Sequence, residues 1–303
     1  MVLEAIISPK TARQKPWLIA VLAFVFVTIG ILASDFLGIQ KSIMAITLIA
    51  IPAVPFLWRL FDFEEAETEQ SVVLGSRTIA RHLPIILVMS MFFIGLIAGF
   101  VFWNIALPTE KSNQIFEVQL NELNNIGAAS GKAISAEPGG QTGSNSGRDD
   151  AGTLSGKAIS SIGDQRFTDT FEMLFFHNLG VLLIILLFSL LYGAGAVLVF
   201  VWNASIIGTF IATYAKKAAV GAAGALLGGV GASALSLVPH GSFELLAYLI
   251  AALGGGILSS AVTREAHKTN SFMLVMHDAL KLTAVAIIFL AIGAFIEAGA
   301  IVG

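Results

Sequence analysis

The sequence predicts an all-α fold, a polytopic transmembrane helical bundle of about seven spans with a flexible Gly/Ser-rich extracytoplasmic loop. Of its 303 residues, 56% are hydrophobic and only 12% are charged, about half the charged share of an ordinary soluble domain. A chain of this length cannot bury so much apolar surface in one water-soluble core. Several apolar segments also approach the roughly 20 residues that a helix needs to cross the bilayer. The bilayer is therefore the expected solvent.

Charge, cysteine content and missing motifs exclude several classes of protein. The net charge is only −3, so the chain lacks the basic surface that binds nucleic acid. It has no cysteine, which excludes disulfides, thiolate metal sites and cysteine nucleophiles. The phosphate-loop pattern G-x-x-x-x-G-K-[ST], the serine elbow G-x-S-x-G and the zinc motif H-E-x-x-H do not occur. We predict no enzymatic activity, no cofactor, no metal and no nucleic-acid partner.

Seven apolar stretches indicate where the chain is expected to enter the membrane. They are Trp17–Ala33, Ser42–Trp58, Leu83–Trp103, Leu174–Tyr214, Ala218–Val238, Phe243–Val262 and Leu282–Ile301. The fourth has 41 residues, interrupted only by Gly193 and Gly195, and as one helix it would be about 60 Å long, twice the hydrocarbon thickness. We therefore expect it to break.

Two arrangements of this region give seven crossings. In the one we favour, Leu174–Val201 spans, residues 203–215 cross only partly, and Ala218–Val238 spans back. In the other, both halves of residues 174–214 span, and the Gly/Ala-rich segment re-enters the membrane from the side it left. Small-xxx-small spacing in that segment, as in Gly224 and Gly228, lets helices approach closely, and we favour a contact within the protein over a dimer contact.

The orientation follows from basic residues in the short flanks of the spans. Lys10, Arg13 and Lys15 place the N-terminus in the cytoplasm. We then expect a multi-pass protein of the cell membrane, with residues 104–173 and the C-terminus extracytoplasmic. The Gly/Ser-rich part of that loop, residues 127–163, contains the hexapeptide SGKAIS twice and is predicted to be flexible.

Three regions are expected along the chain. Residues 1–62 form a basic segment and a two-span hairpin, residues 63–82 an acidic loop and an interfacial helix, and residues 83–303 the remaining transmembrane domain. Ser71 is the candidate N-cap of the interfacial helix, which ends at His82. Glu64 and Glu65 resemble the paired acids of intramembrane CAAX-type proteases, but we expect them in an exposed loop without matched histidines.

The most specific local pattern is Pro239-His240-Gly241 followed by Glu244. Pro239 and Gly241 predict a sharp turn between two spans. His240 and Glu244 are four residues apart and share a face if the helix starts early. The structural interpretation is that Glu244 stabilises the positive end of a helix. Alternatively, the pair binds a metal or relays a proton together with His177, or contacts a protein.

Polar residues in the remaining spans have simpler interpretations. Asn203 is expected to bond to a neighbouring helix and fix the packing. His277, Asp278 and Lys281 are spaced for a local ion-pair cluster at the inner end of the last span. Glu297, near the outer end, is expected to reach headgroups or water.

Residues from about 72 to 303 resemble the stage II sporulation protein M family. The residues that carry the resemblance are Asn178, Gly193, Gly195, Asn203, Gly208, Pro239, His240, Gly241 and Glu244. The layout is also similar, with one span, a sizeable extracytoplasmic loop and then a cluster of spans. The chain departs from the family's namesake by adding the N-terminal hairpin, residues 17–58.

The resemblance implies a multi-span membrane protein without established enzymatic activity. The namesake works with partner proteins in envelope remodelling, so we expect a scaffold that recruits membrane or envelope proteins within the lipid bilayer. A permease for a small solute or ion is the alternative, because broken apolar segments and a Gly-rich span are typical of discontinuous transporter helices.

Overall fold

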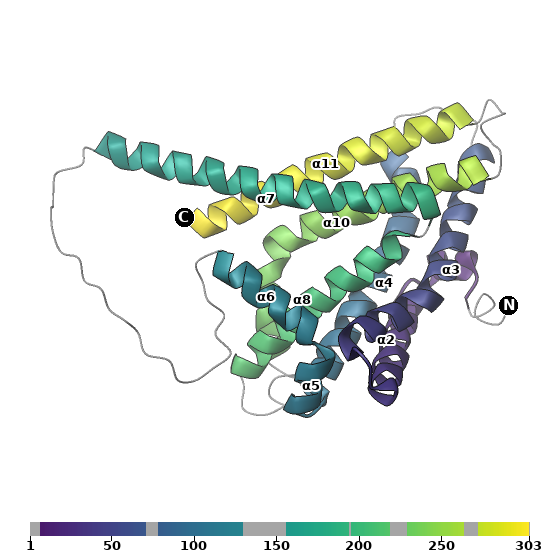
Figure 1. The fold of residues 1–303 in the computed structure, drawn as a ribbon. Coiled ribbons are helices and arrows are strands. Elements are labelled where there is room, and N and C mark those ends of the chain that lie inside the picture. Colours follow the sequence, from purple (N-terminus) through teal and green to yellow (C-terminus); the bar gives the residue numbers. More distant parts are fainter. Residues whose placement is uncertain are drawn as a thin grey trace.

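A computed structural model describes residues 7–70, 78–129, 156–193, 195–218, 229–263 and 272–302. All regular secondary structure in these ranges is helical, and Figure 1 shows the long helices packed side by side in one bundle. Seven of the helices are long and apolar enough to cross a membrane. The predicted all-α transmembrane bundle is confirmed.

The structure describes ten helices in these ranges. Their bounds are α1 Pro9–Gln14, α2 Trp17–Leu37, α3 Lys41–Gln70, α4 Thr78–Ala106, α5 Thr109–Ile115, α6 Glu117–Ala129, α7 Gly156–Tyr192, α8 Ala196–Ala218, α10 Val230–Thr263 and α11 Phe272–Val302. The seven membrane-length helices are α2, α3, α4, α7, α8, α10 and α11. Helix α2 packs against α3 and α4, and α3 also reaches α8 and α10. The N-terminal hairpin is thus part of the bundle.

The long apolar stretch 174–214 divides at Gly193. Helix α7 ends at Tyr192 and α8 begins at Ala196. Gly193 has a φ of +61°, a left-handed conformation that glycine adopts without strain and that ends a helix. The favoured single helix over Leu174–Val201 is therefore wrong, and both halves of the stretch form membrane-length helices. Residues 219–228 of the Gly/Ala-rich segment lie outside the described ranges.

The expected turn at Pro239-His240-Gly241 is also wrong. Helix α10 runs without interruption from Val230 to Thr263, so these three residues lie inside a helix. The C-terminal part of the Gly/Ala-rich segment, residues 230–238, belongs to the same helix and is not a separate span. A proline removes one helical hydrogen bond but keeps a φ close to the helical value, and membrane helices tolerate it where other groups satisfy the freed carbonyl.

The acidic run 62–69 is helical, contrary to the expected exposed loop. It continues α3 as far as Gln70. Glu64 is 1% exposed, so it is a buried residue of the bundle. Glu and Ala favour helices, and nothing in the run interrupts the helix that precedes it. His82 lies within α4, and residues 71–77 of the expected interfacial helix lie outside the described ranges.

The first part of the 104–173 loop folds back onto the bundle. Ile115 of α5, Leu123 of α6 and Phe116 between the two helices are buried against the bundle. The Ser42 hydroxyl donates to Gln119 Oε1 at 2.7 Å, and Gln119 Nε2 donates to Ser205 Oγ at 3.1 Å. This buried chain of hydrogen bonds joins α3, α6 and α8. The predicted flexible segment falls mainly on residues 130–155, which lie outside the described ranges.

Candidate functional site

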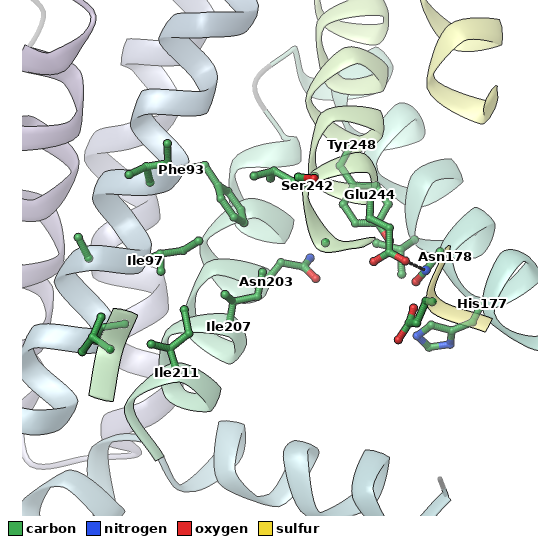
Figure 2. A pocket seen from close by; sticks show the side chains of 18 of the residues that line it. Phe93, Ile97, His177, Asn178, Asn203, Ile207, Ile211, Ser242, Glu244 and Tyr248 are labelled. Atoms are coloured by element: carbon green, nitrogen blue, oxygen red, sulfur yellow. Dashed lines mark hydrogen bonds between the residues drawn. The ribbon is translucent and has the colours of Figure 1, made fainter. Parts of the chain in front are cut away.

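A cavity of about 760 Å³ lies among helices α4, α7, α8, α10 and α11. We call it the Glu244 cavity, and Figure 2 shows the side chains that line it. Its apolar walls come mostly from α4, with further side chains from α8 and α10, and include Phe93, Ile97, Ile207 and Ile211. A volume in this range, with apolar walls and few polar groups, is typical of ligand-binding cavities in proteins.

Polar side chains gather at one end of the Glu244 cavity. The side-chain amide of Asn178 in α7 donates a hydrogen bond of 2.7 Å to Oε1 of Glu244 in α10 (Figure 2). The carboxyl group of Glu297 in α11 interacts with that of Glu244. His177 lines the same end of the cavity. Three helices thus contribute one polar cluster, in which buried Asn178 fixes the orientation of the Glu244 carboxyl group.

Glu244 has a different role from the expected one. We expected its carboxylate to stabilise the first turn of a helix, but α10 begins 14 residues earlier, at Val230. Its structural partner is instead the side chain of Asn178. A polar side chain in a span is costly unless it has a partner, so this contact between α7 and α10 stabilises the packing of the two helices.

Asn203 projects into the same cavity from α8 (Figure 2). Its side-chain amide donates to the Val199 carbonyl at 2.8 Å, one turn earlier in the same helix. The amide group of Asn203 therefore donates within its own helix, and not to a neighbouring helix as expected. A side chain that bonds back to its own helix remains at the cavity wall, where it contributes polarity.

The other motif residues divide between packing and the cavity. Gly208 lies where α8 meets α4, and a Cβ added there would lie 2.6 Å from Cβ of Phe100. Gly241 lines the cavity. The side chains of Pro239 and His240 lie outside the described part of the structure. Among the described residues, no three His, Asp or Glu side chains are grouped as metal ligands.

A second polar cluster lies away from the Glu244 cavity, and sequence reasoning missed it. His82 Nδ1 lies 2.6 Å from Oε1 of Glu64, and His82 Nε2 lies 3.7 Å from Oδ2 of Asp278. Arg13 approaches Glu64 Oε2 at 3.9 Å. All three central side chains are at least nine-tenths buried. We name Glu64, His82 and Asp278 the His82 cluster.

The His82 cluster corrects two expectations from the sequence. Glu64 has a histidine partner although we expected none, and Asp278 faces His82 while the neighbouring His277 is exposed. Successive residues of a helix point about 100° apart, so adjacent polar residues need not share a partner. The sequence did contain one indication of this cluster, because ionisable residues lie at the same end of several spans. Such residues are costly in a membrane unless they pair with one another.

The fold and the buried polar groups together define a multi-pass membrane protein. Residues 88–300, most of the chain, match the family described as Stage II sporulation protein M, so the protein belongs to this family. The match begins within α4, which leaves helices α2 and α3 as the additional N-terminal hairpin. No curated protein and no solved structure matches the chain.

Proposed function

We propose that the protein is a non-enzymatic scaffold of the cell membrane that binds another membrane component at the Glu244 cavity. In this way it recruits or positions partners in cell-envelope or membrane organisation. The supporting observation is that Asn178, Asn203, Gly241 and Glu244, all named from the sequence as family-motif residues, line one cavity. They come from three helices, α7, α8 and α10, that are separated in the sequence.

The lining of the cavity favours binding. Most of the wall is apolar, and Glu244, Asn178 and His177 lie close together at one end of it (Figure 2). Such a surface orients a ligand through a few hydrogen bonds and holds it through apolar contact. The rim reaches the outside of the bundle, because Ile94 in α4 is 49% exposed. A component that diffuses in the bilayer therefore has access to the cavity.

The proposed orientation places the Glu244 end of the cavity toward the extracytoplasmic side. The N-terminal basic residues indicate a cytoplasmic start for α2. Seven crossings then bring the end of α11, which carries Glu297, to the outside. In the same arrangement the His82 cluster lies toward the cytoplasm. The binding site and the buried ionic cluster thus belong to opposite halves of the membrane.

Photo-cross-linking in cells tests this proposal. A photoreactive amino acid at Ile94, on the cavity rim, is expected to give a discrete adduct with a protein or a lipid. The matched control is Ile29, an equally apolar side chain on α2 that is 59% exposed and does not line the cavity. Identical adduct patterns at both positions, or none at Ile94, would contradict specific binding at the cavity.

A permease is the second candidate function. The observation in its favour is that the cavity within the bundle is lined by the polar side chains of Asn178, Asn203 and Glu244. Polar and ionisable residues inside membrane spans often mark the path of a substrate or an ion. Flux of candidate solutes into vesicles that contain the purified protein tests this function. Flux that depends on the protein, and that is lost on Asn203→Leu, would favour the permease over the scaffold.

A further inference from the structure

We infer that the Glu244 cavity binds an amphipathic molecule with one positively charged amine head group. The head group would lie between the carboxyl groups of Glu244 and Glu297, and the hydrocarbon part would lie along α4 and α8. This inference rests on the proposed binding function and adds the chemical class of the ligand. Three observations support it, from charge, shape and access.

Two carboxyl groups, those of Glu244 and Glu297, line the cavity. The carboxyl groups of Glu244 and Glu297 interact with each other. The Asn178 amide, which donates a hydrogen bond to Glu244, carries no positive charge. Between described residues, neither carboxyl group forms an ion pair with lysine, arginine or histidine. Two carboxyl groups this close in a low-dielectric environment do not both ionise and share one proton, and an ammonium group that displaces this proton to water binds both as carboxylates. The pair therefore has the charge that complements an ammonium group.

The rest of the cavity lining is mostly apolar. Away from the carboxyl groups the wall consists of side chains such as Phe93, Ile97, Ile207 and Ile211. A small hydrated cation would leave this apolar surface empty, whereas a hydrocarbon chain fills it. A transmembrane helix about 10 Å wide and 30 Å long occupies on the order of 2,400 Å³, well above the cavity volume of about 760 Å³. The volume favours a small amphiphile over a partner helix.

The rim of the cavity is open to the outside of the bundle. Ile94 and Phe102 line the cavity and are 49% and 38% exposed on the outer surface of the bundle. In a bilayer this surface faces lipid, so a molecule dissolved in the membrane reaches the cavity without crossing water. Both a lipid with an amine head group and a free single-chain amine meet these conditions. The chemistry is shared, and the experiment separates the two sources.

The test compares head groups at constant chain length on the purified full-length protein at neutral pH. Dodecylamine, dodecanol and dodecyl phosphate are titrated, and binding is followed by calorimetry and by the shift of the melting temperature. Dodecylamine is expected to bind about tenfold to a hundredfold more tightly than dodecanol, because a charged hydrogen bond adds to the same apolar contact. Dodecyl phosphate is expected to bind more weakly than the alcohol.

Variants of the two acids test whether the preference for dodecylamine over dodecanol depends on them. Glu244→Gln and Glu297→Gln are each expected to reduce the preference for the amine by about tenfold or more, with little effect on the alcohol. Glu172→Gln, an exposed acid on α7, is the matched control and should change neither affinity. If Glu244→Gln does not fold, the Glu297→Gln variant and the head-group series on the unmodified protein still test whether the cavity prefers an amine.

The source of the amine is tested in nanodiscs. If a lipid is the ligand, dodecylamine should bind more weakly in phosphatidylethanolamine discs than in phosphatidylglycerol discs, because the lipid competes for the cavity. If only free amines bind, dodecylamine should bind equally in both kinds of disc. Equal affinity for amine and alcohol would overturn the inference and indicate that the two acids keep their shared proton instead of binding a cation. A protein adduct at Ile94 without amine preference would also overturn it, yet leave the proposed function standing.

Discussion

The imidazole Nδ1 of His82 in α4 lies 2.6 Å from the Oε1 atom of Glu64 in α3, and both side chains are at most 1% exposed. At the other ring nitrogen, Nε2, Asp278 of α11 lies 3.7 Å away. Helix α3 precedes the region that matches the family, whereas Asp278 lies within that region. The N-terminal hairpin is therefore connected to the family domain through a buried ionic contact.

This contact predicts a large effect of His82→Ala. The substitution leaves two buried carboxyl groups without the imidazole, and breaking a buried pair in this way costs about 3–5 kcal/mol. We expect a clear loss of thermal stability of the detergent-solubilised protein. The control is His277→Ala, because His277 is exposed at the same end of α11. Equal melting temperatures for the two variants would show that the His82 cluster does not stabilise the bundle.

Removal of Glu244 should also destabilise the protein, through a different contact. Glu244→Ala deletes the acceptor of the Asn178 amide, and an unpaired buried amide costs about 1–3 kcal/mol. Glu172→Ala, at an exposed position of α7, should leave the melting temperature unchanged. If Glu244→Ala is fully stable but inactive in cells, Glu244 acts in binding alone and is not needed for packing.

Gly208 is predicted to be intolerant of any side chain. A Cβ at this position would lie 2.6 Å from Cβ of Phe100, an atom fixed close to the backbone of α4, so the two helices must separate. We expect Gly208→Ala to destabilise the protein by about 1–3 kcal/mol. Gly180→Ala is the matched control, since nothing lies within 4 Å of the added carbon, and it should be neutral or slightly stabilising.

The orientation of the bundle can be tested by cysteine labelling, because the chain has no native cysteine. A membrane-impermeant thiol reagent should label Asn121→Cys in intact cells but not His277→Cys. Both positions are exposed, one on α6 and the other at the start of α11. Both variants should react once the membrane is permeabilised. Labelling of His277→Cys alone in intact cells would reverse the proposed orientation.

The sequence by itself determined the fold class and the resemblance to the family. Apolar segments of membrane length predict helices, because the bilayer core offers no water to bond to backbone N–H and C=O groups. These groups must therefore form hydrogen bonds within their own helix. This constraint is local, so the number of membrane-length helices was predictable from the sequence alone. The position of Gly193 also predicted a break, although the sequence left two arrangements of the flanking helices open.

Only the tertiary structure decided which polar residues meet. Glu64 and His82 were assigned to a loop and an interfacial helix, and they form a buried pair because α3 and α4 continue past their apolar segments. Asn178 and Glu244 are 66 residues apart, and no local pattern connects them. Contacts of this kind depend on how helices pack and rotate against each other, which hydropathy and spacing along one chain do not specify.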